Sequence, residues 1–142
     1  MAKRKKKPVH PVTGLTKVQT NQRCKAAMRQ VWRKTSRAKC IRDNRFPHPD
    51  PTSSFTYAVP CAHCPKIMGQ SEKIMYITKK GRRRRRGAYD VNHITDTTMP
   101  PVNDIVTDLG PYADELLHTP VEIVCPECHA KITAEQRKLK FG

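Results

Sequence analysis

The sequence predicts a small α+β fold, and three observations lead to that prediction. Apolar residues recur at helical spacing in the first third of the chain, which indicates an amphipathic helix. Residues 74–78 and 88–94 have the β-branched and aromatic composition of strands. Two Cys-x-x-Cys pairs enclose both strand segments, so the cysteines are expected to hold this part of the chain together.

The expected organisation has four parts. Residues 1–15 form a disordered basic arm, residues 16–46 form one or two basic helices, and residues 47–60 form a Pro- and Ser-rich linker. Residues 61–142 form the cysteine-bearing domain. Within that domain, residues 79–87 are expected to be the tip of a long hairpin, because glycines enclose a run of five arginines.

The helical part is expected to start near Thr16, because Thr16 and Gln19 match a capping box. The spacing of the less polar residues predicts one buried stripe, formed by Cys24, Met28, Val31, Trp32 and Thr35. Ser36 could cap a second short helix that ends before the prolines of the linker. Cys24 and Cys40 stand at unpaired spacing and are interpreted as small buried thiols.

Short elements are expected in the remainder of the chain. Residues 95–120 contain several prolines, so only a short helix at 112–117 is predicted there. Residues 121–124 are predicted to form a short buried strand that leads into the second cysteine pair. A C-terminal helix follows, beginning between Cys128 and a possible capping box formed by Thr133 and Gln136.

Basic residues dominate the charge and are unevenly distributed. The chain has 28 Lys and Arg against 12 Asp and Glu, a net charge of +16. Residues 1–50 hold 15 of the basic residues and two of the acidic ones. A field of this size favours a polyanionic partner over the weaker alternative of a solubilising tail. The residues expected to contact nucleic acid are Lys3, Arg4, Lys5, Lys6, Lys7, Arg29, Arg33, Arg82, Arg83, Arg84, Arg85 and Arg86.

The expected partner is DNA more than RNA, alone or within a larger protein–nucleic acid complex, and not a membrane. No apolar run follows the N-terminal lysines, as a signal peptide would require. No stretch approaches the roughly 20 apolar residues of a membrane span. The protein is therefore expected to be intracellular, with reduced cysteines.

The two cysteine pairs predict a structural zinc site. Two residues between thiolates allow both sulfurs to reach one tetrahedral ion, so the pair Cys61 and Cys64 and the pair Cys125 and Cys128 supply four ligands. The 60 residues between the pairs form a large loop that the ion closes. Four protein ligands leave no open position for catalysis at this ion. His63 is interpreted as a surface residue or a neighbour of the ligands.

Around these pairs the sequence resembles the HNH endonucleases of the zinc-stapled type common in bacteriophages. The resemblance covers about residues 57–140 and is carried by Cys61-Ala-His-Cys64, Val91-Asn92-His93-Ile94, Pro120-Val121-Glu122-Ile123-Val124, Cys125-Pro-Glu-Cys128-His129 and Lys131-Ile-Thr133. Upstream, Arg29-Gln-Val-Trp32-Arg33 is similar to the lead-in of phage members. The resemblance implies a treble-clef-like ββα-metal fold and, for a phage-encoded protein, the host cytoplasm as its location.

The resemblance also implies a mechanism, the cutting or nicking of DNA phosphodiesters. His93 would be the general base that activates a water molecule. Asn92 and His129 would hold one divalent ion, Mg²⁺ or Mn²⁺ or another, which stabilises the charge of the transition state.

Three functional hypotheses remain open at this point. Retention of His93 and His129 favours a metal-dependent HNH endonuclease. Two departures favour a catalytically decayed HNH-fold zinc protein that serves as a DNA- or RNA-binding accessory or regulatory factor in a larger phage or host complex. Asn92 stands where the family has Asp, and Pro120 stands where it has its middle Asn. A ribosome- or RNA-associated zinc protein fits the lysine-rich arm but leaves the end of the strand at His93 unexplained.

Overall fold

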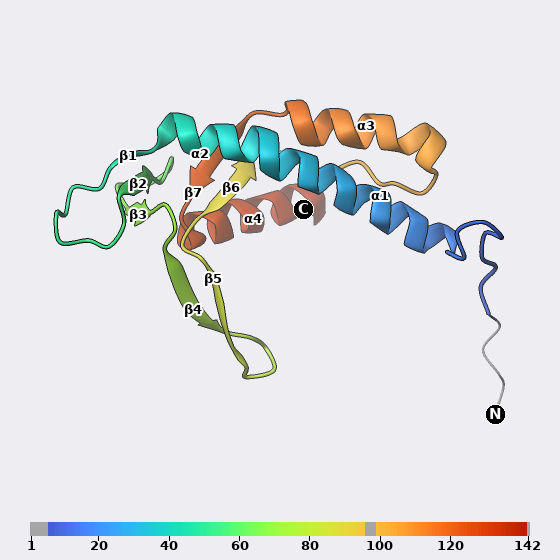
Figure 1. Ribbon diagram of the computed structural model, residues 1–142, viewed down its shortest axis with the longest axis horizontal. Helices are drawn as coiled ribbons and strands as arrows, with labels where there is room; N and C mark the ends of the chain where they lie inside the picture. Colours follow the sequence, from blue (N-terminus) through green and yellow to red (C-terminus); the bar gives the residue numbers. More distant parts are fainter. Residues whose placement is uncertain (1–5, 96–98, 142) are drawn as a thin grey trace.

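The computed structural model describes residues 6–95 and 99–141 of the chain (Figure 1). Residues 3–5 of the expected basic arm lie outside the described residues. The end of that arm is a hydrogen-bonded turn, in which the amide of Gly14 donates to His10 O at 2.8 Å and that of His10 donates to Leu15 O at 2.9 Å. Gly14 has a φ of 69°, a left-handed conformation that glycine adopts without steric cost.

The first helix, α1 (Lys17–Trp32), begins at the predicted capping box. Thr16 Oγ1 accepts from the amide of Gln19 at 3.2 Å, and Gln19 Oε1 accepts from the amide of Thr16 at 2.9 Å. The chain continues without a break through a π-helical turn (Arg33–Arg37) into α2 (Ala38–Asn44). The predicted cap at Ser36 is therefore wrong, because the Ser36 hydroxyl donates to Leu117 O instead.

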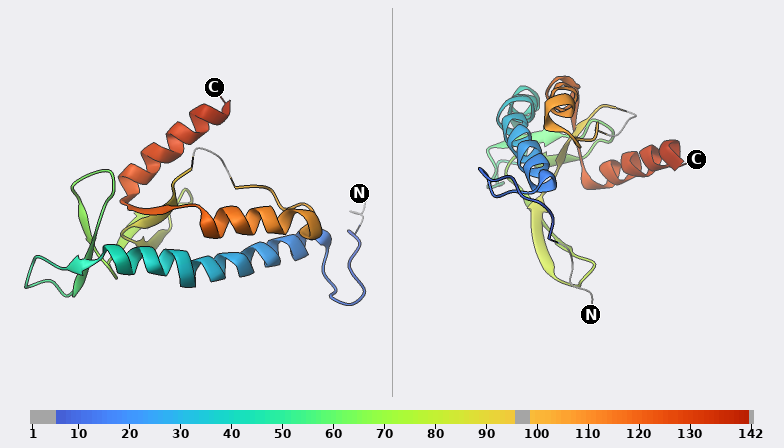
Figure 2. Two further views of the ribbon diagram at one scale, coloured as in Figure 1. Left: turned by 90° about the horizontal axis from the view of Figure 1, so that it is seen from above. Right: turned by 90° about the vertical axis from the view of Figure 1, so that its right-hand side faces the viewer.

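The predicted buried stripe of α1 is only partly buried. Met28 and Trp32 pack against α3 (Ile105–His118), whereas Val31 is 41% exposed. Of the two cysteines interpreted as buried thiols, Cys40 is buried and Cys24 is half-buried. The buried stripe is narrower than predicted because α3 lies along one side of α1 and covers only part of this face (Figure 2).

The helix α3 is twice as long as the segment that the sequence predicted. Asp104 caps it by accepting from the amide of Val106 at 3.0 Å, and Pro111 lies inside it. The helix runs parallel to α1, since Asn21 bonds Asn103 O near one end and Ser36 bonds Leu117 O near the other. Its cap and its packing against α1 outweigh the helix-breaking effect of the proline.

Two strands lie at the ends of the expected linker. β1 (Phe46–Pro47), β2 (Tyr57–Pro60) and β3 (Ile67–Gly69) form a three-stranded antiparallel sheet in that order. The first cysteine pair lies between β2 and β3. The segment 47–60 is thus not a free linker, because its last four residues form β2, which pairs with β1 on one side and with β3 on the other.

The arginine run lies in a hairpin, as predicted, but Arg83 to Arg86 belong to its second strand and not to its tip. β4 (Lys73–Ile77) pairs antiparallel with β5 (Arg83–Gly87), and the turn is at residues 78–82. Gly81 permits that turn with a φ of 76°, and its amide donates to Thr78 O at 2.8 Å. We call β4 and β5 the arginine ribbon, which projects away from α1 and α3 (Figures 1 and 2).

A second pair of strands leads into the last helix. β6 (Asp90–His93) pairs antiparallel with β7 (Val121–Val124), the strand predicted at 121–124. The helix α4 (Pro126–Phe141) follows at once, so Thr133 lies inside it and caps nothing. The core between these elements includes Val59, Met68, Val91, Ile123 and Val124, which confirms the mixed α+β class.

Candidate metal centre and nucleic-acid interface

The four predicted cysteine ligands converge on one point. Cys61 and Cys64 come from the turn between β2 and β3, Cys125 follows β7, and Cys128 lies in the first turn of α4. Their sulfur atoms all lie within 4.8 Å of one another. Cys64 Sγ and Cys125 Sγ, from residues 61 positions apart, are separated by 3.7 Å.

These distances fit a tetrahedral metal ion. A Zn–S bond of about 2.3 Å places neighbouring sulfurs of a regular tetrahedron about 3.8 Å apart. Four soft sulfur donors without oxygen ligands are typical of structural zinc. Three of the cysteines are buried and Cys64 is half-buried, so the cluster can hold a metal ion such as zinc away from solvent.

The electrostatics of the cluster favour a bound cation. Burial raises the pKa of the Cys61 thiol, but the amides of Cys125 and His63 donate to its sulfur and bring the pKa down to about 6. The pKa of Cys128 is raised by its hydrogen bond with Cys125, by burial and by the negative charge of Cys61. One thiolate therefore opposes the ionisation of another, and a divalent ion offsets that repulsion.

The residues proposed for catalysis lie on two sides of β6. Side chains alternate along a strand, so Asp90 and Asn92 face one side while His93 faces the other. His129, in the first turn of α4, places Nδ1 2.9 Å from Asp90 Oδ2. Arg86 donates to the same carboxylate oxygen. Because a carboxylate only accepts hydrogen bonds, Nδ1 of His129 carries the hydrogen and Nε2 has the lone pair.

His93 contacts α1 and α3 instead of α4. Its ring stacks on Trp32, with 5.1 Å between the ring centroids and 24° between the planes. Its Nε2 lies 2.8 Å from Leu116 O, so Nε2 donates and Nδ1 is the acceptor of the neutral ring. The structure thus does not bring the expected base, His93, together with the expected metal ligand, His129.

A second metal site of the expected kind is not formed by the acidic, His and Cys side chains in the described ranges. A shared metal site requires at least three such side chains with their ligand atoms close together. Within residues 6–95 and 99–139, the four cysteines alone meet this requirement. Asn92 shares its side of β6 with Asp90, and Glu122 stands opposite it on β7. The sequence reasoning missed both carboxylates, although the alternation Asp90, Asn92 was a signal.

Glu122 has a partner of its own. His63 Nε2 contacts Glu122 Oε1, and this carboxylate raises the pKa of His63. His63 is thus an exposed residue paired with β7 and takes no part in the four-cysteine group. One side of the β6–β7 pair therefore carries two contacts between a carboxylate and a histidine. Asp90 contacts His129 of α4, and Glu122 contacts His63 of the first cysteine turn.

The arginine ribbon offers the densest charge of the described surface. Arg82, Arg83, Arg84 and Arg85 are exposed, while Arg86 is half-buried beside Asp90. Large apolar side chains stand directly opposite on β4: Met75 is 57% exposed, Tyr76 43% and Ile77 71%. The register places Arg83 and Arg85 on one face of the ribbon and Arg84 on the other.

The other predicted contact residues are less concentrated. Lys6 and Lys7 are exposed, and Lys3, Arg4 and Lys5 lie outside the described residues. Arg29 on α1 and Arg33, the first residue of the π-helical turn, are exposed and line a cavity of about 300 Å³ together with Trp32 and His93.

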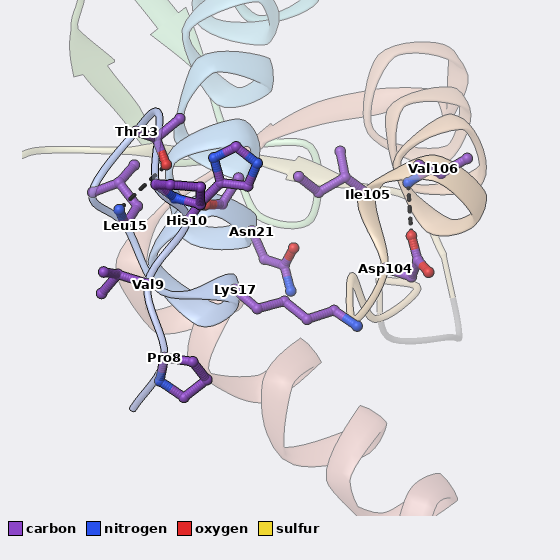
Figure 3. A pocket seen from close by; sticks show the side chains of 12 residues that line it. Pro8, Val9, His10, Thr13, Leu15, Lys17, Asn21, Asp104, Ile105 and Val106 are labelled. Carbon is purple, nitrogen blue, oxygen red and sulfur yellow. Dashed lines mark hydrogen bonds between the residues drawn. The ribbon is translucent and has the colours of Figure 1, made fainter. Parts of the chain in front are cut away.

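A larger cavity, of about 530 Å³, lies at the opposite end of α1 from the cysteines (Figure 3). Apolar residues form most of its wall, including Val9, Leu15, Ile105 and Val106. Lys17 and Asp104 lie at its edge. It contains no cluster of metal ligands and is not continuous with the arginine ribbon, so it is not the site that the charge pattern indicates.

None of the helices in the described part of the chain has both the length and the apolar character needed to cross a bilayer. Comparison of the whole chain with known proteins gives no relative: no family model, no curated protein and no solved structure matches it.

Proposed function

We propose that this protein binds DNA through the arginine ribbon, on a scaffold that a zinc ion at the four cysteines stabilises. The observation that carries the proposal is the composition of β5. Four successive residues of this strand, Arg83 to Arg86, are arginines, and they stand opposite exposed apolar side chains on a ribbon that projects from the core. Burying such a surface against protein would require many acidic partners, whereas a polyanion matches it directly.

The dimensions of the ribbon favour duplex DNA. The major groove of B-form DNA admits a two-stranded β-ribbon, and arginine is the side chain that most often reads guanine there. Met75 and Ile77 lie on the same face as Arg83 and Arg85 and offer apolar contacts to thymine methyl groups. The major groove of A-form RNA is too deep and narrow for such an element. These arguments support DNA over RNA.

The scaffold of the proposal is an HNH-type one. β6 pairs with β7, α4 follows β7 directly, and α3 is inserted between the two strands in the chain. This arrangement supports a ββα unit, with the second cysteine pair where β7 meets α4. The proposed role is that of a non-catalytic DNA-binding accessory or regulatory factor within a larger phage or host complex. The separation of His93 from His129 supports this role over catalysis.

A metal-dependent endonuclease is the second candidate, and a specific pair of contacts favours it. Leu116 O orients His93 with Nδ1 as the proton acceptor, which a general base requires. Asp90 orients His129 with Nε2 as the available ligand atom, on the side of β6 that also carries Asn92. A bound Mg²⁺ or Mn²⁺ would supply charge stabilisation to the phosphoryl group.

Fluorescence anisotropy with a labelled 20-base-pair duplex tests the first proposal. The double variant Arg83→Ala/Arg85→Ala is expected to lose at least about tenfold in affinity, since each arginine contact to a base or phosphate contributes about 1–3 kcal/mol. Arg23→Ala/Arg42→Ala is the matched control, because it removes the same charge from exposed positions on α1 and α2. Equal losses in both doubles would show that net charge, and not the ribbon, determines binding.

Supercoiled-plasmid conversion with Mg²⁺ or Mn²⁺ tests the second candidate. Wild-type protein is assayed beside His93→Ala and His129→Ala. Nicked or linear product that both variants fail to form would establish an HNH nuclease. Intact plasmid with every form, while the duplex still binds, would leave DNA binding as the function.

A further inference from the structure

The cavity between α1, α3 and the end of β6 combines positive charge with aromatic rings. Its volume is about 300 Å³. Three cations, two from α1 and one from the π-helical turn, line it with three rings: Lys25, Arg29, Arg33, Trp32, His93 and Tyr112. We call these six residues the aromatic pocket. It is separate from the four cysteines and from the pair of Asp90 and His129.

The three cations of the aromatic pocket lie on one face of the continuous helix that α1 forms with the π-helical turn, because they follow one another at intervals of four residues. Lys25 Nζ lies 5.4 Å from the centre of the Tyr112 ring, a cation–π contact. Arg29 and Arg33 form no ion pair within the described ranges, and no acidic side chain is among the described residues that line the pocket. The pocket is therefore open to an anion.

The rings of the aromatic pocket are fixed in place. Trp32 and His93 stack on each other, and His93 is held by its hydrogen bond to Leu116 O. Tyr112 is only 2% exposed. Trp32 Nε1 is buried, and no atom of the described chain accepts its hydrogen. A buried donor without an acceptor is uncommon in proteins.

We propose that the aromatic pocket binds one unpaired base of a nucleic acid, with Arg29 and Arg33 at the phosphate of the same nucleotide. The inference rests on the proposed function, since it requires that the chain bind nucleic acid. Stacking on aromatic rings is the usual way in which proteins hold an unpaired base. The volume lies at the lower limit of ligand pockets, which suits one base.

The chain itself connects the aromatic pocket with the arginine ribbon. β5 ends at Gly87, β6 begins three residues later, and β6 ends at His93 in the pocket. In the proposal, the pocket takes an unpaired nucleotide of the nucleic acid whose backbone the ribbon contacts. Fully paired DNA must first lose stacking and pairing energy, so the pocket selects damaged, bulged or single-stranded sites.

Trp32 is the single tryptophan of the chain and therefore reports on the pocket directly. Its fluorescence is measured while the protein is titrated with three 20-base-pair duplexes: fully paired, with one extra adenine nucleotide, and with one extra abasic nucleotide. The adenine bulge is expected to quench Trp32 and to bind at least about fivefold more tightly than the abasic bulge. The paired and abasic duplexes should bind without quenching.

A matched pair of surface variants tests the role of the cations without disturbing the core. Arg29→Ala is expected to weaken binding of the adenine bulge at least about fivefold relative to the paired duplex. Arg23→Ala, which removes the same charge from α1 outside the pocket, should leave that ratio unchanged.

The outcomes separate the two proposals. Tight binding of all three duplexes with equal affinity and an equal Trp32 signal would overturn the base pocket and leave the ribbon function standing. Absence of binding to any duplex would overturn both. An adenine preference that survives in Arg29→Ala and Trp32→Phe alike would place base recognition elsewhere and overturn the inference.

Discussion

Removal of the metal ion is expected to unfold the domain, and the structure sets the magnitude. An ion at the four cysteines would join Cys64 and Cys125, which are 61 positions apart. Closing a loop of that length by a cross-link contributes about 4 kcal/mol in the chain-entropy model. A domain of this size is stable by about 5–15 kcal/mol in total. Loop closure alone is thus a large part of the stability, and the metal–sulfur bonds add to it.

The assay is a circular dichroism melt combined with measurement of bound metal. Chelated wild-type protein is expected to lose the cooperative transition, and Cys125→Ser should lose both metal and transition. Cys24→Ser is the matched control, because Cys24 is half-buried in α1 and lies outside the four-cysteine group. Metal-free wild type that melts at the same temperature and with the same cooperativity as the metal-bound form would refute the reasoning.

Three further predictions concern single residues. Gly69→Ala should destabilise the protein by about 1–3 kcal/mol in denaturant melts, because the new Cβ would lie 2.6 Å from the Phe55 ring. Thr16→Ala should cost about 1 kcal/mol through the capping box, and an unchanged melt would show that the cap is not formed. The amides of Asp104 and Asn103 hold the pKa of Asp108 below its usual range. Its stabilising contribution is therefore present above the usual Asp pKa and is lost as the pH falls through the lowered value. Melts of Asp108→Asn should depend less on acidic pH than those of wild type.

Local rules explain which parts of the fold could be predicted from the sequence. The capping box of α1 depends on residues three apart, and β7 is a short apolar run that ends at a cysteine pair. The four cysteines were identified because their spacing alone determines how thiolates reach one ion. These features need no knowledge of what packs against them.

The errors come from interactions between distant parts of the chain. A run of arginines has no strand preference of its own, yet Arg83 to Arg86 pair with β4 because the turn at Gly81 brings the two segments together. Pro111 lies in a helix because α3 packs against α1, with Tyr112 and Leu116 as the buried contacts. His93 stacks on Trp32, whereas His129 contacts Asp90. The spacing of these residues in the sequence could not show this, because neighbouring side chains of a strand point to opposite faces and the face that each one takes depends on the register.

The salt dependence of DNA affinity tests the central claim most directly. Each phosphate that the protein neutralises adds about 0.9 to the slope of log affinity against log salt concentration. Replacement is preferable to deletion, since β5 pairs along its whole length with β4. The triple variant Arg83→Gln/Arg84→Gln/Arg85→Gln is compared with a control triple that removes three other exposed cations, Arg23→Gln/Lys34→Gln/Arg42→Gln. The account predicts a slope that is smaller by about 2–3 in the ribbon variant and nearly unchanged in the control. A wild-type slope in the ribbon variant would show that the arginine ribbon does not contact the nucleic acid.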